Sequence, residues 1–117
     1  MRIERELMRG AGPLAVLHLL SHGEMYGYEL VEALAKQSNG VLAMGQSTLY
    51  PLLYNLEAKD LIASRVDTSG PRPRRYYHLT GKGKRKLSKD AAQWQELWHA
   101  MRSLGVNPGP AAAGGAL

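Results

Sequence analysis

The spacing of apolar residues changes twice along this chain, and the order of these changes limits the folds it can adopt. As far as about Lys59, apolar residues recur every three or four positions, which is typical of amphipathic helices. Over 61–67 and 74–79 they alternate with polar residues, which is typical of half-buried strands. Helical spacing returns between Thr80 and Leu104. The pattern predicts a mainly α-helical fold with one small β-hairpin.

Three short helices are expected before the hairpin. Met1–Arg9 is interpreted as a short exposed helix or arm. The first core helix is expected to open at Gly12-Pro13, because Pro is well tolerated at the first helical position. His22-Gly23 and Asn39-Gly40 are stop signals for the first and second helices. The expected helices cover about 13–22, 28–38 and 47–59, the last with a buried stripe of Leu49, Leu52, Leu53 and Leu56.

Local signals also bound the hairpin, the last helix and the C-terminal tail. The six turn-forming residues Thr68–Pro73 separate the two strands. Thr80 is a candidate N-cap of a helix that ends near Leu104. Gly105–Leu117 contains Asn-Pro, Gly-Pro and an Ala/Gly run, so it is predicted to be a disordered tail.

Length and composition exclude several classes of protein. A chain of 117 residues is expected to form one domain with its own core. It has no cysteine, which excludes disulfide scaffolds, thiolate metal sites and a cysteine nucleophile. No apolar run approaches 18 residues and no signal-peptide pattern opens the chain, so a cytoplasmic protein without a membrane partner is expected.

The positive charge of the chain is concentrated in one segment. The net charge is +5, and eight of the fifteen Lys and Arg residues lie between positions 72 and 89, where there is no Asp or Glu. This segment is either an ordinary solvated face or a surface that contacts phosphates, since clustered cations release counterions from nucleic acid. Binding to a membrane surface is less favoured because no stripe of large apolar residues accompanies the charge.

No catalytic, cofactor or metal motif is found. The chain lacks a Gly-x-Ser-x-Gly elbow and a Walker-type loop, so catalysis and a bound cofactor are not expected. His18 and His22 have the i, i+4 spacing of metal ligands, but no third ligand motif accompanies them. A packed or solvent-facing histidine pair is therefore favoured over a metal site.

The order of three helices, a hairpin and a long helix is typical of a winged helix-turn-helix protein. In such proteins the third helix enters the major groove and the hairpin, or wing, lies along the DNA backbone. Tyr50 and Tyr54 are four positions apart and therefore share a face of the third helix. Their hydroxyl groups can reach phosphates or base edges, and the guanidinium groups of the wing suit phosphates.

Three separated motifs then resemble one family. They are Tyr26-Gly27-Tyr28-Glu29-Leu30, Ser47-Thr48-Leu49-Tyr50-Pro51-Leu52-Leu53 with Leu56-Glu57, and Pro73-Arg74-Arg75-Tyr76-Tyr77-His78-Leu79-Thr80 with Gly83. Over about Arg9–Lys89 the chain resembles the PadR family of bacterial transcriptional regulators, and its short C-terminal part resembles the small subgroup with one dimerisation helix. The resemblance implies a DNA-binding homodimer that acts as a repressor.

We expect the DNA-binding residues on the third helix, the wing and their flanks. One departure from the family is Gly81-Lys82-Gly83-Lys84, where acidic residues often follow the Thr. Either this turn is poorly ordered or its lysines help to hold DNA, and the second is favoured. The expected DNA-binding set is Tyr26, Gln46, Ser47, Thr48, Tyr50, Pro51, Tyr54, Asn55, Arg72, Arg74, Arg75 and Lys82.

The last helix carries the expected dimer interface. Trp94 and Trp98 share one face, and they form either a simple dimer core or a flat slot for a planar aromatic effector. The expected interface residues are Leu87, Ala91, Trp94, Leu97, Trp98 and Met101.

The expected domains are a winged-helix domain over 1–80 with an N-terminal arm over 1–11, a dimerisation helix over 81–104, and the tail over 105–117. Two other functions stay open. One is a basic nucleic-acid-binding protein without sequence preference, and the other is a ligand-binding or interaction protein that works through the dimer seam.

Overall fold

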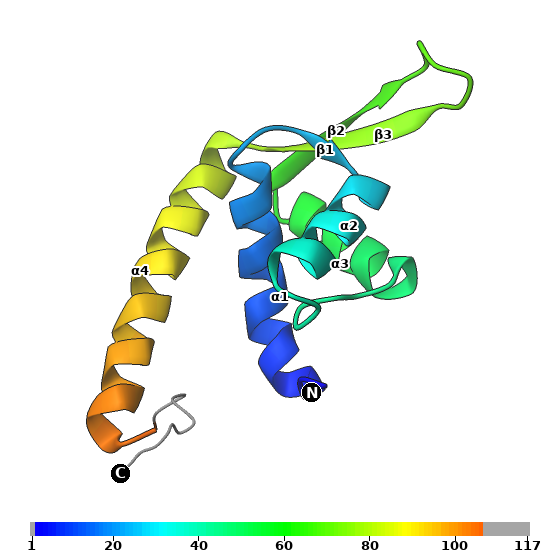
Figure 1. Cartoon of the computed structure of the whole chain (residues 1–117). Coiled ribbons are helices and arrows are strands. Elements are labelled where there is room, and N and C mark those ends of the chain that lie inside the picture. Colours follow the sequence, from blue (N-terminus) through cyan, green and yellow to red (C-terminus); the bar gives the residue numbers. More distant parts are fainter. Residues whose placement is uncertain (1, 107–117) are drawn as a thin grey trace. The chain divides into compact units, whose positions relative to one another are not determined.

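The computed structural model describes residues 2–106 of the chain (Figure 1). The described elements are, in order, α1 (Arg5–Leu20), β1 (Met25–Tyr26), α2 (Gly27–Gln37), α3 (Gln46–Ala58), β2 (Ile62–Asp67), β3 (Arg74–Leu79) and α4 (Gly81–Leu104). This is the predicted winged-helix arrangement followed by a long C-terminal helix. The chain divides into two compact units, one ending at Leu87 and one beginning at Ser88. Most of the predicted tail, from residue 107 onward, lies outside the described residues.

The start of α1 differs from the prediction. The helix begins at Arg5, so most of the expected arm is helical, and Pro13 lies inside the helix instead of opening it. A proline there cannot donate a backbone hydrogen bond. The helix continues because its C-terminal half is anchored in the core through Val16, Leu17, Leu19 and Leu20.

The second and third helices begin and end within one residue of their predicted ends. The backbone N–H of Tyr26 donates to the Glu29 carboxylate at 3.0 Å, which satisfies a donor at the start of α2. After α2, Asn39 and Gly40 adopt positive φ angles of 53° and 84°. The Gly40 N–H donates to the Ala35 carbonyl at 2.7 Å, so Asn39-Gly40 is the stop signal that was predicted.

The sheet has three strands instead of the two predicted. The order is β1-β3-β2, and both pairings are antiparallel. The β2–β3 register runs from Ile62↔Leu79 to Asp67↔Arg74 and leaves the predicted six-residue loop. Strand β1 has only two residues, which is too short for alternation to be visible in the sequence.

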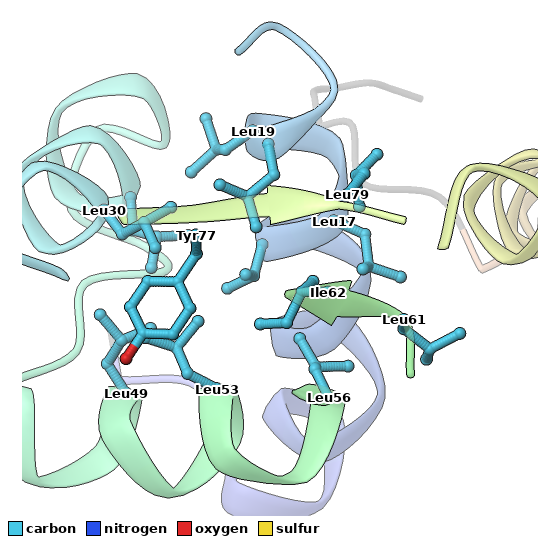
Figure 2. Packing of buried hydrophobic residues seen from close by; sticks show 13 residues of the cluster. Leu17, Leu19, Leu30, Leu49, Leu53, Leu56, Leu61, Ile62, Tyr77 and Leu79 are labelled. Carbon is cyan, nitrogen blue, oxygen red and sulfur yellow. The ribbon is translucent and has the colours of Figure 1, made fainter. Parts of the chain in front are cut away.

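The core lies between the three helices of the first unit and one face of the sheet (Figure 2). The ring of Tyr77 lies among the side chains of Leu30, Leu49 and Leu53, with only 6% of the residue exposed. Burial raises the pKa of the Tyr77 hydroxyl. Tyr77 thus packs under the wing, and alternation places Tyr76 on the opposite, outer face of the sheet.

The first turn of α4 is fixed to the turn that follows α3. The Thr80 hydroxyl donates to the Asp60 carbonyl at 2.6 Å and accepts from the Gly83 N–H at 2.9 Å, so Thr80 is the N-cap. Gly83 is buried, and a Cβ at this position would overlap the Leu61 carbonyl group. The turn is helical and packed, so the alternative of a poorly ordered turn is wrong. Gly83 is needed there because only glycine allows the close approach to Leu61.

Candidate nucleic-acid interface

The outward face of α3 carries polar and aromatic side chains. Leu49, Leu53 and Leu56 hold the helix in the core. Tyr50 is 44% exposed and Tyr54 is 74% exposed. All seven residues predicted on this helix are exposed, namely Gln46, Ser47, Thr48, Tyr50, Pro51, Tyr54 and Asn55. The face offers hydroxyl, amide and ring groups, which are the groups that contact base edges and sugars.

The position of Tyr50 depends on the start of α2. A Cβ at Gly27 would lie 2.8 Å from Cζ of Tyr50, and Gly27 itself is buried. Since such a distance is too short for two carbon atoms, only glycine allows the tyrosine to lie here without moving. Gly27 therefore permits the close approach between the start of α2 and Tyr50 of α3.

The wing is a two-stranded ribbon with a basic tip. Arg72, Arg74 and Arg75 are all exposed. At the other side of the loop, the Ser69 N–H donates to Asp67 Oδ1 at 2.9 Å. Hydrogen bonds from Ser69 lower the pKa of the Asp67 carboxyl, first from its side chain and then from its backbone. Asp67 thus closes the loop as a charged acceptor.

Two adjacent wing arginines lie on opposite faces of the sheet. Arg74 is on the outer face, with its guanidinium carbon 4.6 Å from the centroid of the Tyr26 ring. The Arg75 Nη1 donates to the Ser64 hydroxyl at 3.0 Å, and that hydroxyl donates to Glu57 of α3 at 2.8 Å. The Arg75 side is therefore the side of the sheet that faces α3.

Tyr26 occupies a different position from the other predicted DNA-binding residues. It is partly buried in β1, and its ring lies against Arg74. Lys82 is exposed in the first turn of α4.

The side chains that sequence reasoning missed are Glu24 and Arg65, which form an ion pair across 41 positions of sequence. No local pattern could have revealed this pair.

The second unit carries an exposed apolar stripe on α4. Trp94 is 53% and Trp98 is 39% exposed, and Leu97 and Met101 are exposed as well. Ala91 lies one turn before Trp94 and is also exposed. Leu87, the first residue of the expected interface, differs from these because it packs against the core of the first unit.

His18 of α1 lies beside His22, which follows the end of this helix. His18 and His22 meet edge to face, with their Nε2 atoms 3.4 Å apart. Between residues 2 and 106, no group of three or more potential ligands is placed to hold a metal ion. No helix in this part of the chain is long and apolar enough to cross a membrane.

Three core helices, an antiparallel wing with a basic tip and an exposed polar third helix define a protein of the winged helix-turn-helix class. Residues 16–89 match the model of the family described as transcriptional regulator PadR-like. The chain belongs to this family of transcriptional regulators.

Several relatives of the chain are known. A PadR family transcriptional regulator from Eggerthella lenta is 39% identical, with a TM-score of 0.76 and 85% of each chain covered. The transcriptional regulator Rv3488 of Mycobacterium tuberculosis is 34% identical over 93 residues, which are 80% of this chain and 84% of the relative. Bacillus subtilis PadR, solved in complex with operator DNA, is 28% identical with a TM-score of 0.63, over 68% of this chain and 44% of that one.

Proposed function

We propose that this regulator binds operator DNA as a homodimer and acts as a repressor. In this proposal residues 1–80 bind DNA, residues 81–104 form the dimerisation helix, and α3 enters the major groove. The observation that carries the proposal is that one compact unit carries both an exposed polar face on α3 and an exposed arginine-rich wing. A relative, Bacillus subtilis PadR, was solved in complex with operator DNA, which supports DNA as the partner.

The individual residues have distinct proposed roles. The proposed phosphate contacts come from cations of the wing and of the first turn of α4, and these contacts do not read the base sequence. The cations are Arg72, Arg74, Arg75 and Lys82. The third helix supplies sequence discrimination through Tyr50, Tyr54 and Asn55, assisted by Gln46, Ser47, Thr48 and Pro51. Tyr26 is assigned a supporting role beside Arg74, because its ring lies against that guanidinium group.

The exposed stripe on α4 is proposed to pair with the same stripe of a second copy. Two tryptophans, a leucine and a methionine on one helix form an apolar surface of the kind that dimers bury. The dimer would place two α3 helices on half-sites about one turn of DNA, 34–36 Å, apart. Leu97→Glu is expected to yield a monomer in sedimentation and to weaken binding to a two-half-site operator.

An aromatic effector at this seam is a further part of the proposal. Indole rings offer flat faces to planar or cationic ligands. A ligand that favours a dimer unable to span both half-sites would release the DNA. Quenching of tryptophan fluorescence together with loss of the DNA complex supports this part. Quenching without any effect on DNA would instead favour a ligand-binding protein.

The deciding experiment is a binding titration with DNA from immediately upstream of the gene and a scrambled duplex, at roughly 50 and 200 mM salt. We expect a strong preference for the upstream duplex and two protomers per site. Arg74→Ala should weaken binding to every duplex, whereas Asn55→Ala or Tyr50→Phe should also reduce discrimination. Equal affinity for both duplexes, lost together as salt rises, would favour a nonspecific nucleic-acid-binding protein and contradict the proposal.

A further inference from the structure

We infer that Tyr26 and Arg65 are positioning residues that hold the wing residue Arg74 ready for a DNA phosphate. They belong, with Tyr76, to a stack of four side chains on the outer face of the sheet. The inference rests on the proposed DNA-binding function and adds to it. Arg65 was not among the predicted DNA-binding residues, and Tyr26 was expected to contact DNA directly.

The stack alternates cationic and aromatic groups. At one end the Arg74 guanidinium lies over the Tyr26 ring at 4.6 Å from its centroid. The Tyr26 and Tyr76 rings then meet edge to face, with centroids 5.4 Å apart and planes at 69°. At the other end the Arg65 guanidinium lies 4.9 Å from the centroid of the Tyr76 ring. Each contact has the geometry of a favourable aromatic or cation–π interaction.

Strand register explains why these side chains meet. Tyr26 of β1 and Arg65 of β2 are both paired with Tyr76 of β3, so the three residues form one row across the sheet. Arg74 lies two positions before Tyr76 and therefore points to the same face. The first unit alone contains the whole stack.

An ion pair fixes the far end of the stack. Arg65 Nε donates to Glu24 Oε2 at 3.1 Å, and Arg65 Nη2 contacts Glu24 Oε1, so the pair is bidentate. Glu24 directly precedes β1, whereas Arg65 lies on β2, at the opposite edge of the sheet. The pair therefore joins the two edges across β3, and it turns the planar Arg65 group toward Tyr76.

The stack can prepare Arg74 for binding. An exposed arginine samples many rotamers, and fixing them on binding opposes association. Stacking uses the flat face of the guanidinium group and leaves its in-plane N–H donors for phosphate oxygens. A side chain already restricted by Tyr26 loses less freedom when it meets DNA. Tyr26 and Arg65 thus act on affinity through Arg74.

A double-mutant cycle in the full chain tests this coupling, with duplex affinity measured at several salt concentrations. Tyr26→Phe keeps the ring and should bind within about twofold of the wild type. Tyr26→Leu should bind roughly two- to fivefold more weakly, the size of one exposed cation–π contact. In an Arg74→Ala background, Tyr26→Leu should have no further effect.

The salt dependence separates the loss of a phosphate contact from the loss of positioning. Arg74→Ala should reduce the slope of log affinity against log salt by about the amount that one phosphate contact contributes. Tyr26→Leu removes no charge and leaves Arg74 able to reach the phosphate, so it should lower affinity at every salt concentration without changing this slope. Arg65→Lys keeps the charge but not the planar stack, so it should weaken binding only when Arg74 is present. Thermal unfolding of each variant provides the check on folding.

Several outcomes would overturn the inference. Tyr26→Phe binding as weakly as Tyr26→Leu would mean that the hydroxyl contacts DNA directly. Effects of Tyr26→Leu and Arg74→Ala that simply add would mean that the two residues act independently. Wild-type affinity of the Arg65→Lys variant would mean that Arg65 does not help to position Arg74. A wild-type chain that binds no duplex would instead contradict the proposed function itself.

Discussion

Gly27 and Tyr50 lie in contact at the junction between the first residue of α2 and the exposed face of α3. A Cβ on Gly27 would lie 2.8 Å from Cζ of Tyr50, closer than two carbon atoms approach without strain. Tyr50 is held at one end by its own helix and is limited at its ring by Gly27. Gly27, which lies 23 positions earlier in the chain, thereby limits where the Tyr50 side chain can lie on the exposed face of α3.

Gly27→Ala is expected to displace the Tyr50 side chain and to weaken operator binding by about 1 kcal/mol, the size of one lost hydrogen bond. The fold should tolerate the change, because Tyr50 is 44% exposed and can move into solvent. In a Tyr50→Ala background the Gly27→Ala change should no longer affect DNA affinity. An equal loss in both backgrounds, measured by titration, would contradict this account.

Two nearby glycines should differ sharply in their tolerance of a methyl group. At Gly83 a Cβ would overlap the Leu61 carbonyl group, which belongs to the backbone and cannot rotate away. Gly83→Ala should therefore destabilise the fold by about 1–3 kcal/mol or more. At Gly81 the nearest atom to a Cβ is Arg85 Nη1 at 3.6 Å, an ordinary contact. Gly81→Ala is the matched control and should be neutral or stabilising by up to about 1 kcal/mol in denaturant unfolding.

Thr80→Val should destabilise the start of α4 while keeping the size of the side chain. The change removes the acceptor for the Gly83 N–H and the donor to the Asp60 carbonyl. A loss of about 0.5–2 kcal/mol is expected from the missing cap. Thr80→Ser keeps the hydroxyl and should recover most of this stability. Equal unfolding midpoints for the Val and Ser variants would exclude a capping role.

The Glu24–Arg65 pair should make stability depend on pH in one direction. A hydrogen bond from Arg65 lowers the pKa of the Glu24 carboxyl below its ordinary value of 4.5. Because the folded chain favours the ionised carboxylate, this contribution is present above that value and is lost as the pH falls through the lowered pKa. The Tm difference between wild type and Glu24→Gln should be small, since the pair is exposed, and it should shrink as the pH is lowered below 4.5. A difference that persists unchanged at acid pH would contradict the role of this pair.

The periodic elements of the fold were predictable because each was long enough to show its own pattern. Helices α2 and α3, the β2–β3 hairpin with its six-residue loop and the Thr80 cap all follow from local spacing and turn chemistry. The predicted start of α1 is wrong. Its Pro13 is an opening signal on local grounds, but the helix runs through it from Arg5, and the residues beyond Pro13 are anchored in the core.

The candidate site was predictable in composition and only partly in arrangement. The exposed residues of α3 and the arginines of the wing could be named from helical and strand spacing. Their partners could not, since alternation alone does not tell which face of the sheet meets α3. Arg74 and Arg75 look equivalent in the sequence, yet one lies over Tyr26 and the other is bonded through Ser64 to Glu57.

The sequence by itself determined the order of elements, the basic wing, the polar face of α3 and membership of the family, because each is carried by residues that lie close together or by recurring motifs. Only the tertiary structure decided that β1 joins the sheet, that Gly83 is required beside Leu61, and that Glu24 and Arg65 anchor the stack reaching Arg74. These features depend on contacts between residues distant in the chain. Such contacts have no period or spacing, and they exist only once the strands and helices have packed together.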